Sequence, residues 1–152
     1  IVAFVEKAAT VVRENDPRRR PVTASLSGVH SWPRLWSSPG IDLVQIHPYP
    51  AARGKRDLFA TLAREVPKLR AFGKPVLIGE EGLAHGPPPE TGEFRPRTEV
   101  GYRQALWAAL MTGCANGGMF WWINGYDREH AGFFPAVCTP TQRFADRLDF
   151  PG

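Results

Sequence analysis

The sequence predicts an α/β fold with a parallel sheet. Short apolar segments with the length of buried strands alternate with longer segments that have helical spacing. Such alternation indicates parallel strands, because a crossover connection must return the chain to the same end of the sheet. Four units in about 130 residues amount to half of an eight-stranded (β/α)8 TIM barrel. An open doubly wound sheet is disfavoured because no G-x-G-x-x-G turn follows any strand.

The first elements are a helix over residues 1–15 and a strand over residues 21–26. Apolar residues share one side of this helix: Ile1, Val5, Ala8, Val11 and Val12. Asp16-Pro17 ends the helix, since the residue before a proline avoids helical geometry. Residues 27–40, rich in Ser, Pro and Trp, predict a short connection with at most a turn or two of helix.

The central elements are a strand over residues 41–49, a helix and a strand over residues 74–80. Asp57 can cap the helix, which runs to about Phe72, and Pro67 is expected to kink or split it. Four apolar residues share one face of this helix: Phe59, Leu62, Val66 and Leu69.

The last third predicts a loop, a helix, an aromatic strand and a final helix. The loop, His85 to Arg97, is too rich in proline for regular structure, and the helix spans about Thr98 to Thr112. Small residues on that helix allow close packing on a sheet: Ala105, Ala108 and Ala109. Residues 118–123 read as the strand. The final helix is announced by a capping box with proline at the first helical position, Thr139-Pro140-Thr141-Gln142.

Composition is that of one ordinary globular domain over residues 1–152, with 43% hydrophobic and 22% charged residues. The net charge of +4 is spread along the chain apart from Arg18-Arg19-Arg20, which is explained by a solvated turn, so we expect no nucleic-acid partner. We also expect no membrane partner, because the uncharged stretch from Gln104 to Tyr126 is interrupted by a helix stop and a turn. The two cysteines and four histidines lack metal-ligand spacing, so no metal and no cofactor is expected.

Polar residues gather where two of the predicted strands end. In the strand over residues 41–49, alternation places Gln45, His47 and Tyr49 on one side, which we assign to the barrel interior. In the next strand it places Val76, Ile78 and Glu80 on one side and turns Glu81 away. Adjacent parallel strands would bring His47 and Tyr49 next to Glu80 at the C-terminal rim, where barrel active sites lie.

This grouping has a chemical consequence. Two donors beside one carboxylate favour its ionised form, which suits a nucleophile more than a proton donor. Trp121 or Trp122, whichever faces inward, could stack on a sugar ring, although core packing is an equal explanation for either one alone.

The motifs resemble those of the retaining glycoside hydrolases of clan A, closest to the cellulase-like and mannanase-like enzymes around family 5. The resemblance lies in Lys-Pro-Val-Leu-Ile-Gly-Glu at 74–80, His-x-Tyr at 47–49 and Gly-Met-Phe-Trp-Trp at 118–122. It implies that these are strands seven, six and eight, that Glu80 is the nucleophile, and that His47 and Tyr49 lie beside it. Trp121 is the preferred match for the indole that lines the cleaved sugar's subsite, with Trp122 possible. The family often has an aromatic residue after the nucleophile, and here Glu81 takes that place.

The acid/base carboxylate is absent from the sequence. Retaining enzymes need a second carboxylate about 5 Å from the nucleophile. The family carries it in an Asn-Glu pair on strand four, and no such pair occurs here. We therefore expect the chain to hold strands five to eight and to require an N-terminal half-barrel as partner, being inactive alone. The chain opens on Ile1 without a methionine or a signal-like segment, so we expect the natural N-terminus to lie upstream and make no assignment of a compartment.

The substrate implied by the resemblance is a β-linked oligo- or polysaccharide. Loops 28–40, 83–97 and 124–138 would build the cleft walls, and candidates there for sugar contacts are His30, Trp32, Asn124 and Asp127. One alternative is a sugar-binding or scaffolding barrel without catalysis. Another, a phosphosugar isomerase, is disfavoured because no glycine-rich turn follows the last two strands to hold phosphate.

Overall fold

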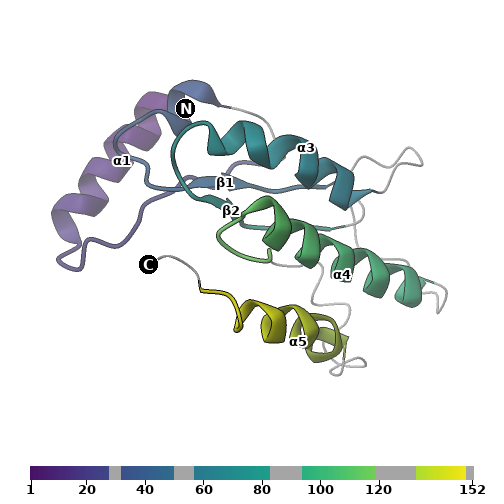
Figure 1. The fold of residues 1–152 in the computed structure, drawn as a ribbon. Helices are drawn as coiled ribbons and strands as arrows, with labels where there is room; N and C mark the ends of the chain where they lie inside the picture. The colour runs from purple at the N-terminus through teal and green to yellow at the C-terminus, as the bar shows by residue number, and fades with distance from the viewer. Residues whose placement is uncertain (28–31, 50–56, 83–93, 119–132, 150–152) are drawn as a thin grey trace.

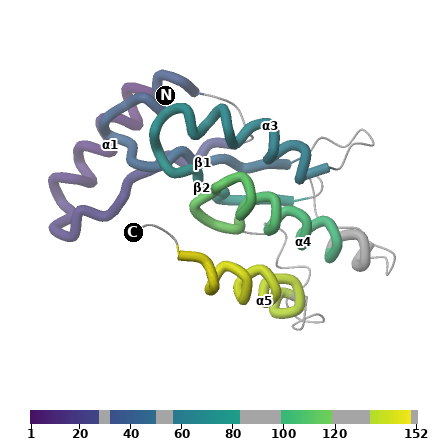
Figure 2. Tube along the Cα trace, in the orientation of Figure 1, coloured from purple at the N-terminus to yellow at the C-terminus, as the bar shows by residue number. Residues whose placement is uncertain are grey.

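The computed structural model describes residues 1–27, 32–49, 57–82, 94–118 and 133–149, with side chains omitted for 94–98 and 133. The helices and strands follow one another as shown in Figure 1, with the same trace drawn as a tube in Figure 2. They are α1 (Val2–Asn15), α2 (Pro33–Trp36), β1 (Val44–Ile46), α3 (Leu58–Arg70), β2 (Val76–Ile78), α4 (Phe94–Thr112) and α5 (Phe133–Ala145).

β1 and β2 form a parallel pair that is joined through α3, as predicted. Their register aligns Val44 with Val76 and Ile46 with Ile78. Each strand is only three residues long, shorter than the sequence pattern suggested. The parallel β-α-β unit is confirmed, while the half-barrel of which it would form part remains a prediction.

Two further segments lie alongside this pair. On one side the amide of Asp42 donates to the carbonyl of Val22 at 2.8 Å, and the Thr23 hydroxyl donates to the carbonyl of Leu43 at 2.8 Å. On the other side the amide of Ala115 donates to the carbonyl of Val76 at 2.7 Å. The predicted strand at 21–26 is thus an extended segment without a regular ladder. The predicted strand at 118–123 lies outside the described residues except for Gly118.

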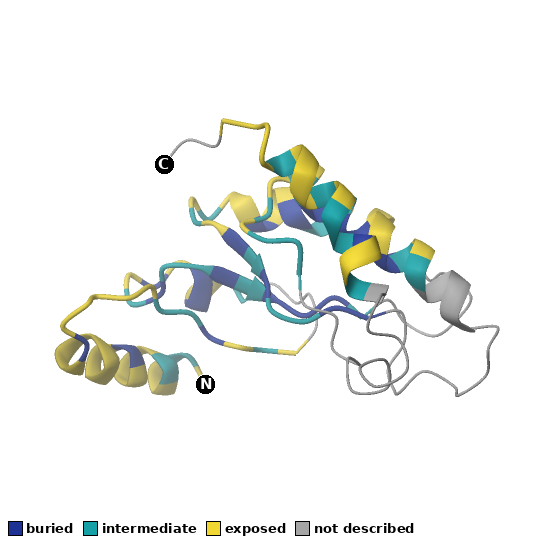
Figure 3. Cartoon of the chain, turned by 90° about the horizontal axis from the view of Figure 1, so that it is seen from below, coloured by how far each residue is buried: buried dark blue, intermediate teal, exposed yellow. Residues whose placement is uncertain are grey.

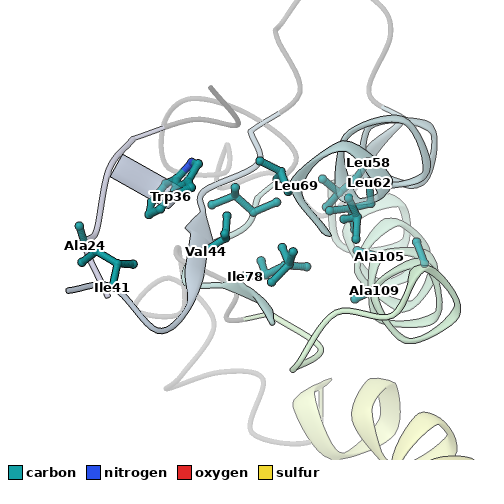
Figure 4. Close-up of a cluster of buried hydrophobic side chains, with 14 of the residues drawn as sticks. Ala24, Trp36, Ile41, Val44, Leu58, Leu62, Leu69, Ile78, Ala105 and Ala109 are labelled. Carbon is teal, nitrogen blue, oxygen red and sulfur yellow. The ribbon is translucent and has the colours of Figure 1, made fainter. Parts of the chain in front are cut away.

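One face of the strand pair is covered by helices. Val44 and Ile46, together with their register partners Val76 and Ile78, are at most 1% exposed and belong to the main core cluster. Figure 4 shows this cluster between the strands and helices α3 and α4. The helical residues that close it are Leu58, Leu62, Val66, Leu69, Ala105, Ala108 and Ala109. The small alanines of α4 lie in one cluster with the buried residues of both strands, which agrees with the predicted packing of this helix on the sheet.

Helix α3 starts where the sequence predicted. The Asp57 carboxylate accepts a hydrogen bond from the Ala60 amide at 2.8 Å, which caps the helix. Pro67 does not split it, since the helix continues to Arg70. Of the four apolar residues assigned to one face, Leu62, Val66 and Leu69 are buried, whereas Phe59 is 48% exposed and Leu58 occupies the core at 3%.

Helix α1 forms over the predicted residues but buries a different surface. Val2 and Val5 pack on the core and Ala9 is buried, whereas Val11 and Val12 are 52% and 47% exposed. The apolar side of this helix is thus only partly covered, because no described element lies against the rest of it (Figure 3). An ion pair at 2.8 Å between Arg13 and Asp42 helps to attach the helix to the start of β1.

The last two helices begin earlier than predicted. α4 starts at Phe94, inside the segment expected to be an irregular loop, and ends at Thr112 as expected. α5 starts at Phe133, so the capping box at Thr139 lies inside a helix. The reason is packing: Val137 is 1% exposed in a second cluster with Tyr102 and Leu106 of α4, with Phe134 packed against it. That apolar contact extends α5 N-terminally past the local capping signal.

Within the described ranges, no helix combines the length and the apolar character that a bilayer crossing requires.

Candidate active site

The ends of β1 and β2 bring three polar side chains together. Tyr49 Oη donates a hydrogen bond of 2.9 Å to Glu80 Oε2, and His47 Nδ1 lies 3.4 Å from the same oxygen. The His47 side chain is 7% exposed and that of Glu80 is 23% exposed. The two strands are parallel, so their carboxyl ends meet at one edge of the sheet. The predicted grouping of His47, Tyr49 and Glu80 is therefore present.

The predicted faces that led to this grouping are partly wrong. Val76 and Ile78 are buried toward the helices, opposite to the side that carries Gln45 and His47. Strict alternation would place Glu80 with Ile78 on the helix side. Glu80 nevertheless reaches Tyr49, because regular strand geometry ends at Ile78 and the chain turns the next side chains.

Gly79 connects β2 to Glu80 at a point where no side chain has room. A Cβ atom at Gly79 would collide with the amide of Gln45 and would lie 2.8 Å from His47 Nε2. Real Cβ atoms essentially never approach a neighbour this closely. The space beside residue 79 is therefore occupied by the side chains that support the site.

Gln45 and Ser25 hold the far side of the His47 ring, and the sequence argument missed their roles. Gln45 Nε2 lies 3.0 Å and Ser25 Oγ lies 3.3 Å from His47 Nε2. An amide nitrogen can only donate, so His47 Nε2 accepts and the ring proton resides on Nδ1, facing Glu80. A signal for Gln45 existed, since it precedes His47 by two residues on the same face. Ser25 belongs to a separate segment and had no such signal.

The electrostatics of the site keep Tyr49 in its donor form. Burial raises the pKa of the Tyr49 phenol, and the hydrogen bond to Glu80 and the charges of Glu80 and Glu81 raise it further. An ionised phenolate would face a carboxylate at 2.9 Å, which is unfavourable. The Tyr49 hydroxyl thus remains protonated and holds one oxygen of Glu80.

Glu81, next in sequence, has a different environment. Its side chain is 0% exposed, and neither carboxyl oxygen has a hydrogen-bond partner among the described residues. Burial raises the pKa of Glu81 to about 8. A Cβ atom at Gly118 would lie 2.7 Å from Glu81 Oε2 and 3.0 Å from a methyl group of Ile78, so this carboxyl lies against the core end of β2. Such a group is not accessible to a substrate.

The remaining predicted site residues are not brought to this group by the described structure. Trp121, Trp122 and Asn124, and the loop candidates His30 and Asp127, lie outside the described residues. Trp32 is described and packs against the main core cluster.

Elsewhere, the described residues contain an apolar cavity and no cluster of metal-ligating side chains. In the ranges that the structure describes, no three His, Cys, Asp or Glu side chains gather as metal ligands would. A cavity of about 580 Å³ lies between α4 and α5 and is lined mainly by apolar residues, including Leu106, Leu110 and Cys138. None of His47, Tyr49 and Glu80 lines it.

Comparisons with known proteins returned nothing. No model of a known family matches the chain, and neither the curated proteins nor the solved structures contain a match.

Proposed function

We propose that this chain is the C-terminal half of the catalytic barrel of a retaining β-glycosidase, with Glu80 as its nucleophile. The observation that carries the proposal is the convergence of Tyr49 and His47 on one oxygen of Glu80, at 2.9 and 3.4 Å. A carboxylate held by two neighbours at the carboxyl edge of a parallel sheet is oriented before a substrate arrives. The resemblance of the three strand motifs to clan A enzymes gives this arrangement its chemistry.

In this mechanism Glu80 attacks the anomeric carbon of a β-linked sugar and forms a covalent glycosyl-enzyme intermediate. Both contacts are made to Oε2, so Oε1 is the oxygen that meets the sugar. Tyr49 and His47 hold Oε2 of the carboxylate, and Gln45 fixes the His47 tautomer. No cofactor takes part.

The second carboxylate has to come from elsewhere. It protonates the leaving oxygen and later activates water, and it lies about 5 Å from the nucleophile in retaining enzymes. Glu81 is disqualified by its complete burial. We assign the acid/base role to a partner half-barrel outside these 152 residues, with Trp121 or Trp122 and Asn124 completing the sugar subsite.

The test uses substrates that need no acid catalyst. 2,4-Dinitrophenolate leaves without protonation, so 2,4-dinitrophenyl 2-deoxy-2-fluoro-β-glycosides can trap a nucleophile even when the acid is absent. We expect incubation with the glucosyl, mannosyl and cellobiosyl reagents to release one equivalent of dinitrophenolate for at least one sugar. Peptide mass spectrometry should then place the fluorosugar on Glu80.

The controls separate catalysis from nonspecific reaction. Glu80→Gln should abolish release, while Tyr49→Phe should slow labelling about 10-fold or more, as expected for loss of a hydrogen bond to a charged group. Glu14→Gln, an exposed carboxylate on α1, should label at the wild-type rate. Equal dinitrophenolate release by the wild type and Glu80→Gln would refute the nucleophile. Glycan binding that is unchanged in Glu80→Gln, without labelling, would favour the non-catalytic sugar-binding protein.

A further inference from the structure

Glu81 stands out among the described residues as a buried polar group without a described function. Its side chain is 0% exposed, and both carboxyl oxygens are without a hydrogen-bond partner among those residues. An ionised carboxylate in such surroundings is strongly unfavourable, because it loses its hydration and gains no hydrogen bond or counter-charge in return. The protonated acid loses much less.

The groups around Glu81 offer no compensating charge. Its carboxyl lies against Ile78 and beside Gly118, at the position that a Cβ atom of residue 118 would occupy. The titratable groups of the described residues that sense its charge are Tyr49 after β1, Cys114 after α4 and Cys138 of α5. All three are neutral or negative, and burial raises the pKa of each. Burial alone raises the pKa of Glu81, and no described Lys, Arg or His offsets this effect.

Glu81 directly follows the candidate nucleophile in the chain. Glu80 and Glu81 are consecutive, yet one carboxyl faces Tyr49 and the other lies in the core. Both side chains leave one short segment after β2, so we expect movement of the Glu81 carboxyl out of the core to shift the backbone that places Glu80 beside Tyr49.

We propose that Glu81 is a positioning residue that works as an uncharged carboxylic acid: buried, it fixes Glu80 against Tyr49, and loss of its proton to solvent releases both residues. The device makes the Glu80 site sensitive to pH on the alkaline side. Its link to catalysis rests on the proposed role of Glu80, whereas the proton switch itself is measurable without any glycoside. Failure of the labelling experiment above thus leaves this test intact.

The test is an NMR titration of the 152-residue chain between pH 4 and 9.5. Through-bond experiments assign the Glu81 carboxyl carbon in the wild type. The chain has three tyrosines, so a sample labelled at tyrosine Cζ gives three ring signals, and Tyr49→Phe identifies the one from Tyr49. We expect the Glu81 carboxyl to titrate with a midpoint near pH 8 and the Tyr49 signal to move with the same midpoint.

The variant that tests coupling is Glu81→Gln, which resembles the protonated acid and cannot ionise. In Glu81→Gln the Tyr49 signal should keep its low-pH position up to pH 9.5. Any pH-dependent change of the Tyr49 signal that does not come from Glu81 would survive in Glu81→Gln and is separated in this way. Glu14→Gln, on the exposed side of α1, should leave both titrations unchanged.

Clear outcomes contradict the proposal. A Glu81 carboxyl that titrates near its ordinary value of 4.5 would overturn it, and so would a Tyr49 signal that moves with the same midpoint in Glu81→Gln. If Glu81→Gln does not fold, Glu81→Met, which is apolar and of similar length, replaces it with the same expectation. If neither variant folds, the wild-type titration of the assigned Glu81 carbon decides.

Discussion

At the scale of single residues, the candidate site depends on one position that carries no side chain. Gly79 lies between the end of β2 and Glu80, and the volume that its side chain would need is filled by Gln45 and His47. Gln45 Nε2 lies 3.0 Å from His47 Nε2, and this hydrogen bond holds the His47 ring with its Nδ1 toward Glu80. A substitution at Gly79 therefore acts on the nucleophile through its supporting residues.

We expect Gly79→Ala to lower the free energy of unfolding by about 1–3 kcal/mol, the usual cost of inserting a methyl group into filled space. Urea denaturation followed by tryptophan fluorescence measures it. Gly40→Ala is the matched control, because its added Cβ would meet ordinary neighbours at 3.4 and 3.6 Å. Equal stability of the two variants would show that Gln45 and His47 can move aside at no cost.

At the scale of elements, β2 has its outer edge covered by a side chain. The Asn116 amide accepts from the backbone N–H of Ile78 and donates to its carbonyl, both at 2.8 Å. The amide thus takes the place of a neighbouring peptide group and prevents two backbone groups from remaining unpaired. It also aligns the 115–118 segment with β2, so that Gly118 comes to lie against Glu81.

Replacing this side chain should destabilise the protein. We expect Asn116→Ala to cost about 2–4 kcal/mol, since two partly buried backbone groups lose their partners. Hydrogen exchange of the Ile78 amide should accelerate by the corresponding factor. Asn116→Asp keeps the acceptor for the Ile78 N–H but loses the donor to the Ile78 carbonyl. Its stability should therefore lie between those of the wild type and Asn116→Ala. Asn15→Ala, which removes an exposed hydrogen bond on α1, should change stability by less than about 1 kcal/mol.

The elements also show what the sequence can and cannot predict. The parallel β-α-β unit and the meeting of Tyr49 with Glu80 follow from apolar runs and from the positions of polar residues at strand ends. The start of α5 does not, because contacts of Phe134 and Val137 with α4 extend the helix past the local signal at Thr139. Nor does the tight packing at Gly79, because the side chains that fill the space beside it, Gln45 and His47, come from another segment of the chain.

At the scale of the whole molecule, the hydrogen-bonded carboxylates and the buried carboxyl of Glu81 have opposite effects on how stability changes with pH. Hydrogen bonds from Arg20 lower the pKa of Asp16 to about 2, and those from Val22 and Arg13 lower that of Asp42. These groups stabilise the fold above their unfolded pKa, and that contribution is lost as the pH falls through the folded values. The raised pKa of Glu81 acts in the opposite sense: its contribution is complete below about 4.5 and is lost as the pH rises toward 8.

The fold should accordingly be most stable at mildly acidic pH. Between about pH 5 and 8, Glu81 alone should reduce the free energy of unfolding by about 1.4 kcal/mol per pH unit. Urea titrations at intervals of one pH unit measure this slope, and Glu81→Gln should flatten it. A wild-type slope that is retained in Glu81→Gln would assign the effect to other groups.

The outer side of α1 governs how the purified chain behaves when it is concentrated. Ile1, Phe4, Val11 and Val12 leave 70%, 75%, 52% and 47% of their surfaces in water, and a net charge of +4 keeps neighbouring molecules apart. Added salt at about 0.1 M screens that repulsion beyond about 10 Å. It leaves the exposed apolar surface of α1 unchanged. Solutions of this chain should therefore turn cloudy on salting at protein concentrations that remain clear in dilute buffer.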